Sequence, residues 1–180
     1  MFLLKNTAMR KILLQLAISL DGYIEGPNGE YDWCLTDQDY GMSEFFKRID
    51  SVLMGRKSYE LTLSMAEDAM PGFPKLKEYV CSTTLTDVKP GVTLLKENIE
   101  EEIRQLKNEP GKDIWLFGGA SLTSSLLNLA LVDEIILAVH PLILGSGKPL
   151  FTSINNRVPL KLQNSQTYSS GLVMLTYTLT

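Results

Sequence analysis

Apolar runs alternate with helix-like segments over the first three quarters of the chain, and this alternation predicts strands joined by helices. Residues 11–20 are mostly apolar with β-compatible side chains and end at Asp21-Gly22, which indicates a central strand. Residues 132–139 are almost continuously apolar, as is typical of a strand covered on both faces. Shorter strands are expected at residues 51–54, 78–82, 92–95 and 113–117.

Helical patterns fill the segments between these strands. In the segment 97–108, acidic side chains crowd the first turn and Lys107 lies near the end, as the helix dipole favours. After the strand at 113–117, Leu122, Leu126 and Leu129 recur at helical spacing and indicate a buried helix face. Helices are therefore expected at residues 39–49, 58–67 and 97–108, and after the strand at 113–117.

The last part of the chain has a different pattern. Residues 160–168 and 172–179 flank a Ser-Ser-Gly turn, which predicts a closing antiparallel hairpin. The expected architecture is α/β, with a mostly parallel central sheet, helices on both faces and a C-terminal antiparallel hairpin. A chain of 180 residues fits a single domain, which we expect at residues 9–180. Residues 1–8 are expected to be an N-terminal extension, with Met9 as an alternative start.

Two glycine turns, at residues 51–58 and 114–121, each lie between an apolar run and a helix-like run. A helix N-terminus presents unpaired backbone N–H groups and partial positive charge, so it favours phosphate. Two such sites could hold the two ends of a dinucleotide. Arg56 and Lys57 could neutralise an extra phosphate, which points to NADP rather than NAD. The alternative is two tight turns without a ligand and two solvated charges.

Composition removes several other classes of function. The net charge is −4 and no Lys/Arg cluster offsets it, which argues against a nucleic-acid binder. Cys34, Cys81 and the single His140 cannot supply a zinc site by the usual spacings, so no metal is expected. His140 is interpreted as a structural histidine with a satisfied hydrogen bond. No apolar run approaches the roughly 20 residues of a membrane span, and the first residues do not have the pattern of a signal peptide. We expect a cytoplasmic protein with two free thiols.

Four blocks, at residues 19–24, 54–60, 117–121 and 131–134 running into 141–151, occur in an order and spacing that cover nearly the whole chain. Together they resemble the dihydrofolate reductase superfamily. The branch is the one that contains the reductase domain of riboflavin biosynthesis and its small stand-alone relatives, many of them bacterial. The resemblance implies the three-layer dihydrofolate reductase-like fold and NADPH as the cofactor.

The resemblance also implies which positions would contact the cofactor. Ala17 and Ile24 would line the nicotinamide end. The phosphates, including the 2′-phosphate, would contact Gly55, Arg56, Lys57 and Ser58 on one side and Phe117, Gly118, Gly119, Ala120 and Ser121 on the other. Ser82 and Thr83 would face the adenosine end, although they could also be plain turn residues.

The substrate side gives weaker signals. Trp33, Phe45 and Phe46 could form one aromatic wall of a substrate pocket, although core packing is expected for at least one of the two phenylalanines. Reduction of a C=N bond also needs a proton, and dihydrofolate reductases keep an acid on the first helix. Here that position falls at or near Met42. The candidate donors are Asp21, Asp39 and Glu44, or a water molecule.

Two functions remain. The first is an NADPH-dependent reductase that transfers a hydride to a small heterocycle. That substrate would be of pteridine or pyrimidine type, such as a dihydrofolate-like or 5-amino-6-(5-phosphoribosylamino)uracil-like compound. The second is an NADP(H)-binding module without turnover. A homodimer is also expected, from the resemblance and from the apolar residues 142–144 and Leu150-Phe151.

Overall fold

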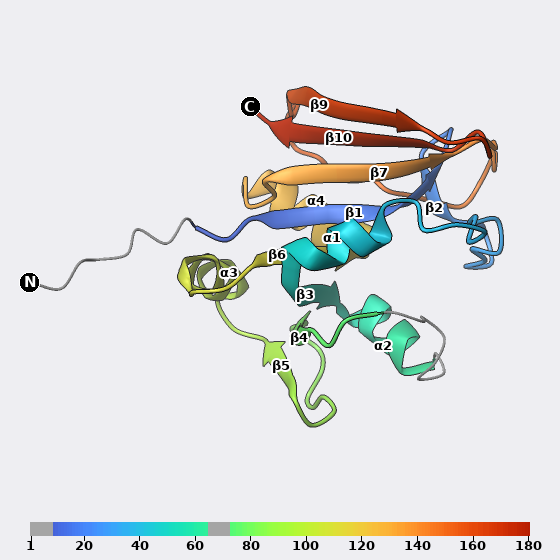
Figure 1. Ribbon diagram of the computed structural model, residues 1–180. Coiled ribbons are helices and arrows are strands. Elements are labelled where there is room, and N and C mark those ends of the chain that lie inside the picture. Colours follow the sequence, from blue (N-terminus) through green and yellow to red (C-terminus); the bar gives the residue numbers. More distant parts are fainter. Residues whose placement is uncertain (1–8, 65–72) are drawn as a thin grey trace, which may run out of the picture.

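The computed structural model describes residues 9–64 and 73–180 (Figure 1). Within these residues an eight-stranded sheet has the order β5-β4-β3-β6-β1-β7-β10-β9. Its strands are β1 (Ile12–Ser19), β3 (Ile49–Gly55), β4 (Lys77–Cys81), β5 (Val92–Leu95), β6 (Asp113–Gly118), β7 (Glu134–His140), β9 (Leu160–Thr167) and β10 (Val173–Leu179). The helices are α1 (Met42–Arg48), α2 (Arg56–Ser64), α3 (Ile99–Asn108) and α4 (Ala120–Asn128).

The strands from β5 to β7 are all parallel, and only β10 runs against its two neighbours. This order confirms the predicted mostly parallel sheet with a C-terminal antiparallel hairpin. Parallel neighbours need crossover connections, and α2, α3 and α4 lie in the connections from β3 to β4, β5 to β6 and β6 to β7. The parallel neighbours β4 and β5 are joined by residues 82–91 without a helix. The predicted extension at residues 1–8 lies outside the described residues.

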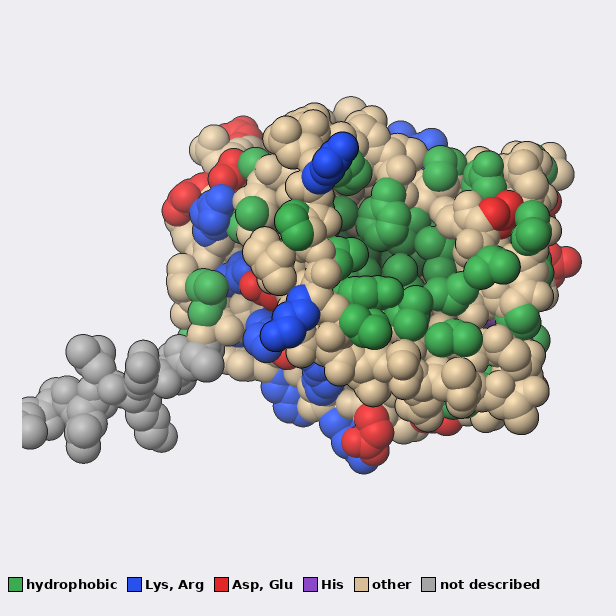
Figure 2. Space-filling view, turned by 90° about the horizontal axis from the view of Figure 1, so that it is seen from above, with side chains coloured by type: hydrophobic (Ala, Val, Ile, Leu, Met, Phe, Trp, Pro, Cys, Tyr) green, Lys and Arg blue, Asp and Glu red, His purple; other side chains and the backbone are tan. Residues whose placement is uncertain are grey.

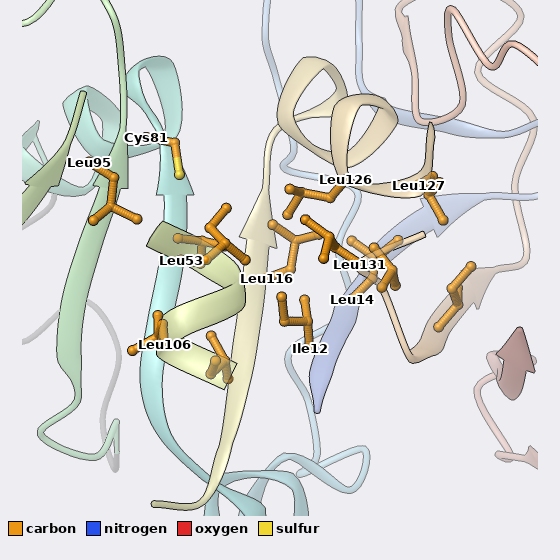
Figure 3. Packing of buried hydrophobic residues seen from close by; sticks show 14 of the residues in the cluster. Ile12, Leu14, Leu53, Cys81, Leu95, Leu106, Leu116, Leu126, Leu127 and Leu131 are labelled. Atoms are coloured by element: carbon orange, nitrogen blue, oxygen red, sulfur yellow. The ribbon is translucent and has the colours of Figure 1, made fainter. Parts of the chain in front are cut away.

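Two apolar clusters hold the helices against the two faces of the sheet. On one face, Phe45 of α1 and Tyr59 of α2 pack with Leu13, Val52 and Trp115 from the strands. On the other face, α3 and α4 cover the apolar side of the central strands, and Figure 3 shows these side chains pointing toward one another: Leu106, Leu126, Leu127, Ile12, Leu14, Leu53 and Leu116. Helices therefore cover both faces, as the alternating pattern predicts, and the domain has three layers.

The sheet opens at its centre. β1 pairs with β6 only from Ile12 to Leu14. Beyond these residues β1 continues along β7, while β6 continues along β3. At the start of the opening, Nε1 of Trp115 donates a hydrogen bond to the carbonyl oxygen of Gln15 at 3.0 Å. The C-terminal halves of the two central strands are consequently separated, and a ligand can enter at such a point.

The first helix differs from its predicted bounds. A helix was expected over 39–49, but α1 begins at Met42 and Ile49 already belongs to β3. Tyr40 and Gly41 have positive φ angles of 48° and 81°, which are incompatible with a continuous right-handed helix. The Asp39 carboxylate instead accepts the backbone N–H of Ser43 at 3.0 Å and caps the first turn. The second helix begins at Arg56 rather than residue 58, and residues 65–67 of its predicted span lie outside the described part.

A small second sheet was missed by the sequence pattern. It pairs β2 (Tyr23–Glu25) with β8 (Lys148–Pro149), and each strand is too short to give a periodic signal. Gly147 precedes β8 with a φ of 139°, and a Cβ there would lie 2.2 Å from the carbonyl oxygen of Glu25. Only glycine fits this close approach, which brings Lys148 toward the ends of the central strands.

Candidate cofactor and substrate site

The first cavity lies where β3, β4 and β6 end, and it has a volume of about 620 Å³. We call it the glycine cavity, because its walls include both predicted glycine turns. The predicted residues that line it are Gly55, Arg56, Lys57, Ser58, Ser82, Thr83, Gly119, Ala120 and Ser121. Predicted residues from three separate parts of the sequence thus meet at the carboxyl edge of a parallel sheet, where ligands bind in open α/β folds.

Among residues 9–64 and 73–180, the backbone N–H groups at the start of α4 have no side-chain partner. Gly119 is the N-cap residue and makes no side-chain cap hydrogen bond, so the first N–H groups of α4 are available to a ligand. A Cβ added at Gly119 would lie 3.4 Å from Oγ of Ser58 and 3.7 Å from Nζ of Lys148. This position is a cradle between a hydroxyl, an ammonium group and a helix N-terminus, and it fits a phosphate group.

Three cationic side chains border the glycine cavity. Arg56 begins α2, and its Nη1 lies 3.0 Å from Oε1 of Glu60. Lys57 follows it. Lys148 comes from β8, and its Nζ lies 2.6 Å from Oε1 of Glu25. Lys148 was not among the predicted cofactor residues. The available signal for Lys148 was its neighbour Gly147, which lies in one of the four blocks that carry the resemblance. A glycine there can mark a close approach of two backbone segments.

The hydroxyl of Ser82 also has a local role. Its Oγ accepts the backbone N–H of Leu85 at 3.0 Å and that of Thr84 at 3.2 Å. These bonds shape the turn after β4, as the alternative interpretation expected. The turn nevertheless places both Ser82 and Thr83 on the cavity wall.

A second cavity of about 600 Å³ lies beside α1, and we call it the α1 cavity. Its walls come from β1, the segment 34–40, α1 and the ends of β7 and β10. They include Gln15, Ala17, Cys34, Leu35, Thr36, Gln38, Asp39, Tyr40, Met42, Ser43, Phe46, Phe73, Ala138, His140, Leu172 and Met174. Ala17 lies in the part of β1 that no longer pairs with β6. It is therefore on the wall of the α1 cavity, beside the opening in the sheet.

The structure does not bring every predicted residue to a cavity wall. Ile24 packs against the cluster on the α3–α4 face, and Phe117 packs edge-on against Trp115 with ring centroids 5.1 Å apart. Gly118 has a φ of 116° and joins Gly119 through a cis peptide bond. Trp33 packs edge-on against His140, 5.3 Å between centroids, while its neighbours Cys34 and Leu35 line the α1 cavity. Phe46 does line that cavity, next to Phe73.

The three acidic candidates occupy different environments. Asp21 lies on the turn after β1, where its carboxylate accepts the Ser19 hydroxyl and the backbone N–H groups of Leu144 and Gly145. The Ser19 hydrogen bond is the main cause that lowers the pKa of Asp21. Hydrogen bonds from Ser43 likewise lower the pKa of Asp39 on the rim of the α1 cavity. A carboxyl group with a lowered pKa is ionised at neutral pH and is a weak proton donor. Glu44 is exposed and forms an ion pair with Lys47.

His140 is a structural residue, as predicted. It is 2% exposed, its Nε2 accepts the backbone N–H of Leu35 at 3.1 Å, and its Nδ1 lies 2.9 Å from the carbonyl oxygen of Ala138. A backbone N–H can only donate, so Nε2 is the acceptor and Nδ1 carries the proton. The neutral ring therefore fixes the segment around Leu35 over β7.

Gln15 is a site residue that the sequence pattern did not indicate. It points from β1 into the α1 cavity, is 7% exposed, and donates from Nε2 to the Met42 sulfur at 3.2 Å. A polar residue inside an otherwise apolar strand was the available signal. Met42 occupies the start of α1, where the resemblance places an acid, so this part of the cavity carries an amide and a thioether.

Burial raises the pKa of both thiols. Cys34, on the wall of the α1 cavity, has a pKa of about 11, and Cys81, on the wall of the glycine cavity, has a pKa of about 12. Both are free cysteines.

Within residues 9–64 and 73–180 no group of three or more His, Cys, Asp or Glu side chains could hold a metal ion. None of the described helices is long and apolar enough to cross a membrane.

Comparison with known proteins gives a consistent result. The family described as the RibD C-terminal domain matches residues 10–174. The uncharacterized protein YyaP of Bacillus subtilis (strain 168) is 45% identical over 181 residues, covering 96% of each chain. A putative riboflavin biosynthesis protein from Shewanella sp. PV-4 has a TM-score of 0.82 and 28% identity, covering 94% of this chain and 99% of its own.

A further solved structure is similar in fold. Dihydrofolate reductase from Enterococcus faecalis, complexed with NADP(H) and RAB-propyl, has a TM-score of 0.68 and 17% identity, and the match covers 94% of this chain and 96% of that one. The predicted dihydrofolate reductase-like fold is therefore confirmed.

Proposed function

The chain belongs to the RibD C-terminal domain family, and from this premise we propose that it is an NADPH-dependent reductase that transfers a hydride to a small heterocyclic substrate. The observation that carries the proposal is the cradle at Gly119, which lies between Ser58, Lys148 and the uncapped start of α4. A structural turn alone would not require an ammonium group and open N–H groups at one point. A pyrophosphate is stabilised by both.

The cofactor would extend from the glycine cavity toward the opening in the sheet. The N-terminus of α4 and Ser58 would bind the pyrophosphate, with Lys148 as a further cation that the sequence analysis did not include. Arg56 and Lys57 would bind the 2′-phosphate, with Ser82 and Thr83 near the adenosine. The nicotinamide would enter between β1 and β6 and reach Ala17 on the wall of the α1 cavity, where the substrate would lie. The neighbouring dihydrofolate reductase of Enterococcus faecalis, which is complexed with NADP(H), supports this assignment.

When bound, NADPH supplies the hydride, and the protein supplies position and exclusion of water. Gln15 would orient a heterocycle through its amide, and Phe46 would contact the flat ring. The substrate is proposed to be of pteridine or pyrimidine type. A putative riboflavin biosynthesis protein among the structural neighbours supports this class. Asp39 and Glu44 stay predictions as proton donors. Asp21 is proposed to stabilise the loop before β8 through its hydrogen bonds, rather than to donate a proton.

Comparative titration of NADPH and NADH tests the proposal. Calorimetry should show binding of NADPH and much weaker binding of NADH, because only NADPH presents a 2′-phosphate to Arg56 and Lys57. Absence of binding by either cofactor would contradict the proposal. We place the activity in the cytoplasm, where two free cysteines are maintained.

The second candidate function is an NADP(H)-binding module without turnover. It is favoured by one observation, the amide and thioether of Gln15 and Met42 where an acid was expected. An assay of NADPH oxidation with a panel of conjugated imines and carbonyls separates the two. Clear binding without oxidation by any panel member would favour the module.

We also propose that the chain is a homodimer. Of the expected surface, Leu150 is 1% exposed and belongs to the core, so it is unavailable to a partner, whereas Ile143 and Phe151 are exposed. A second exposed apolar surface, which we propose as the interface, is the face of β7, β10 and β9 that continues beyond α4. Register places Leu160 opposite Leu179, and Leu162 opposite Tyr177, on this face.

Figure 2 shows hydrophobic side chains gathered over a broad, hollowed area when the molecule is seen from the β9–β10 side. Leu160 and Leu162 are 42% and 51% exposed, which is unusual for leucines on a strand. A second copy presents the same apolar face and could cover it in a symmetric dimer. A register shift in β9 pairs Asn164 with Thr176 and Leu162 with Tyr177, so these two residues of β9 lie on opposite faces. A variant Leu162→Glu should therefore sediment as a monomer, and Asn164→Glu should not. Sedimentation of the wild-type chain as a 20.1 kDa species alone would contradict the dimer.

A further inference from the structure

The α1 cavity contains no cationic side chain among its described lining residues. Its polar groups are amides, hydroxyls, one neutral histidine and the carboxylate of Asp39. The adjoining hollow on the other side of residues 38–42 contains one arginine, Arg48. Both terminal nitrogens of Arg48 already bind Glu134, at 2.8 and 3.0 Å. The hydrogen bonds to Glu134 raise the pKa of Arg48, so the pair is held as an ion pair.

The sequence explains this charge distribution. Residues 12–46 contain neither Lys nor Arg, but they contain seven acids: Asp21, Glu25, Glu30, Asp32, Asp37, Asp39 and Glu44. Much of the cavity wall comes from this segment. A phosphate or carboxylate tail would meet the carboxylate of Asp39 here and no cationic side chain among the described lining residues.

The inner wall of the cavity gives a second, independent observation. Gln15 is more than nine-tenths buried and lines the cavity, and within the described residues the only hydrogen-bond partner of its side-chain amide is the Met42 sulfur. The carbonyl oxygen of this amide is an acceptor that a ligand can use. His140 cannot donate from Nε2, because that atom accepts the Leu35 N–H. The cavity thus favours a ligand with N–H or positive charge, and it offers no buried acid.

We infer that the substrate is an unphosphorylated, cationic C=N heterocycle, either a protonated imine or a quaternary iminium. This inference rests on the proposed reductase function and names its substrate class. In the reaction, the C–H bond at C4 of NADPH breaks and its hydride forms a new C–H bond at the iminium carbon. The C=N π pair moves onto nitrogen and cancels its positive charge, and NADPH becomes NADP⁺. No proton from the protein is required, which accounts for the amide and thioether at the place of an acid.

A matched pair of probes tests the charge requirement. The probes are N-(2-hydroxyethyl)-3,4-dihydroisoquinolinium and its phosphate monoester, which share the same ring and differ in the tail. We expect kcat/KM for NADPH oxidation to be about tenfold or more higher with the hydroxyethyl compound, because like charges repel the phosphate. Calorimetry of the same probes with the NADP⁺-loaded protein should give the same order of affinity without requiring turnover.

The neutral imine 3,4-dihydroisoquinoline tests the proton requirement. Its rate should fall as the pH rises above the pKa of the free imine, while the rate with the quaternary probe should stay level. Equal or tighter binding of the phosphate ester, or equal pH profiles for the two rings, would overturn the inference. The proposed function would survive both results, since it fails only if NADPH does not bind or no probe oxidises it.

Thr36 allows the charge to be changed without disturbing the fold, because it is exposed and lines the α1 cavity. Thr36→Lys should raise kcat/KM for the phosphate ester and lower it for the hydroxyethyl probe. Thr36→Met introduces an uncharged side chain of similar length. It should leave the ratio of kcat/KM for the hydroxyethyl probe to kcat/KM for the phosphate ester near the wild-type value. A ratio that does not move in Thr36→Lys would contradict the role assigned to charge.

Discussion

The two cavities have nearly equal volumes, about 620 and 600 Å³, but they differ in charge and in the kind of backbone that forms them. The glycine cavity is bordered by Arg56, Lys57 and Lys148 and by the start of an uncapped helix. The α1 cavity is lined by side chains, several of them apolar, and its charged wall residue is Asp39. A ligand with phosphate at one end and a flat ring at the other therefore has one favourable orientation.

This difference follows from which segments build each cavity. Glycine turns and short strands bring backbone groups and cations to the first, whereas the segment 12–46, without Lys or Arg, forms much of the second. The separation teaches that one sheet edge can place a cavity bordered by cations beside a cavity without them, as the proposed cofactor and substrate would require. It also identifies the substitutions that should affect one cavity and leave the other unchanged.

Filling the cradle should have the largest effect. Gly119 has φ and ψ of −82° and −171°, an extended conformation that alanine also adopts. The new methyl group would occupy the space between Ser58 and Lys148 where a phosphate is proposed. We expect the affinity for NADPH to fall roughly 100-fold or more, because the phosphate could no longer approach the backbone N–H groups closely. Calorimetry would measure it.

The melting temperature of Gly119→Ala without ligand serves as the control, and it should stay near the wild-type value. An unchanged affinity for NADPH would place the phosphates elsewhere. Binding of the hydroxyethyl iminium probe to the NADP⁺-free protein should be unaffected, because that site belongs to the α1 cavity.

Removing a cation should have a smaller and cofactor-specific effect. Arg56→Ala should weaken the binding of NADPH about tenfold or more and should hardly change the binding of NADH, because a charge-assisted hydrogen bond to the 2′-phosphate is lost. Lys89→Ala is the matched control: Lys89 also forms an exposed ion pair, with Glu78 at 3.0 Å, and neither residue lines a cavity. Equal weakening of both cofactors would assign Arg56 to the pyrophosphate instead.

Asp21→Ala should have a modest effect on stability, and its pH dependence identifies the cause. Hydrogen bonds lower the pKa of Asp21 in the folded chain below its ordinary value of 3.8. Its contribution is therefore complete above that value and is lost as the pH falls through the lower folded pKa. Thermal melts should show a melting temperature slightly below that of the wild-type chain at pH 7, and this difference should disappear in strong acid. A decrease that persists unchanged at pH 2 would indicate a cause other than the ionised carboxylate.

The fold was predictable because its signals are local and repeated. The apolar strands, the acidic start of α3 and the Ser-Ser-Gly turn each specify their own element, and nine predicted cofactor residues meet in one cavity. The prediction that helix α1 extends over residues 39–41 and Ile49 was wrong. Asp39 caps the helix and Tyr40 and Gly41 adopt left-handed conformations, which helical spacing does not reveal.

Long-range placement was not predictable from spacing. Lys148 reaches the glycine cavity through a two-residue strand, and Gln15 matters only because β1 separates from β6 beyond Leu14. Phe117, beside a predicted phosphate turn, points to the aromatic cluster instead, since alternate residues of a strand face opposite sides. The apolar face of β9 and β10 becomes visible only when the helices that cover the sheet are located.

The smallest expected effect uses one cysteine in each cavity as a reporter. With pKa values of about 11 for Cys34 and about 12 for Cys81, only about one thiol in a thousand or fewer is ionised at pH 8, so iodoacetamide should react slowly with both. Adenosine 2′,5′-bisphosphate, half of NADPH, should slow the labelling of Cys81 several-fold further and leave Cys34 unchanged. Single variants Cys34→Ser and Cys81→Ser allow each rate to be measured separately by mass spectrometry. Protection of Cys34 but not Cys81 would reverse the assignment of the two cavities, because the phosphate-bearing half of the cofactor would then bind beside α1.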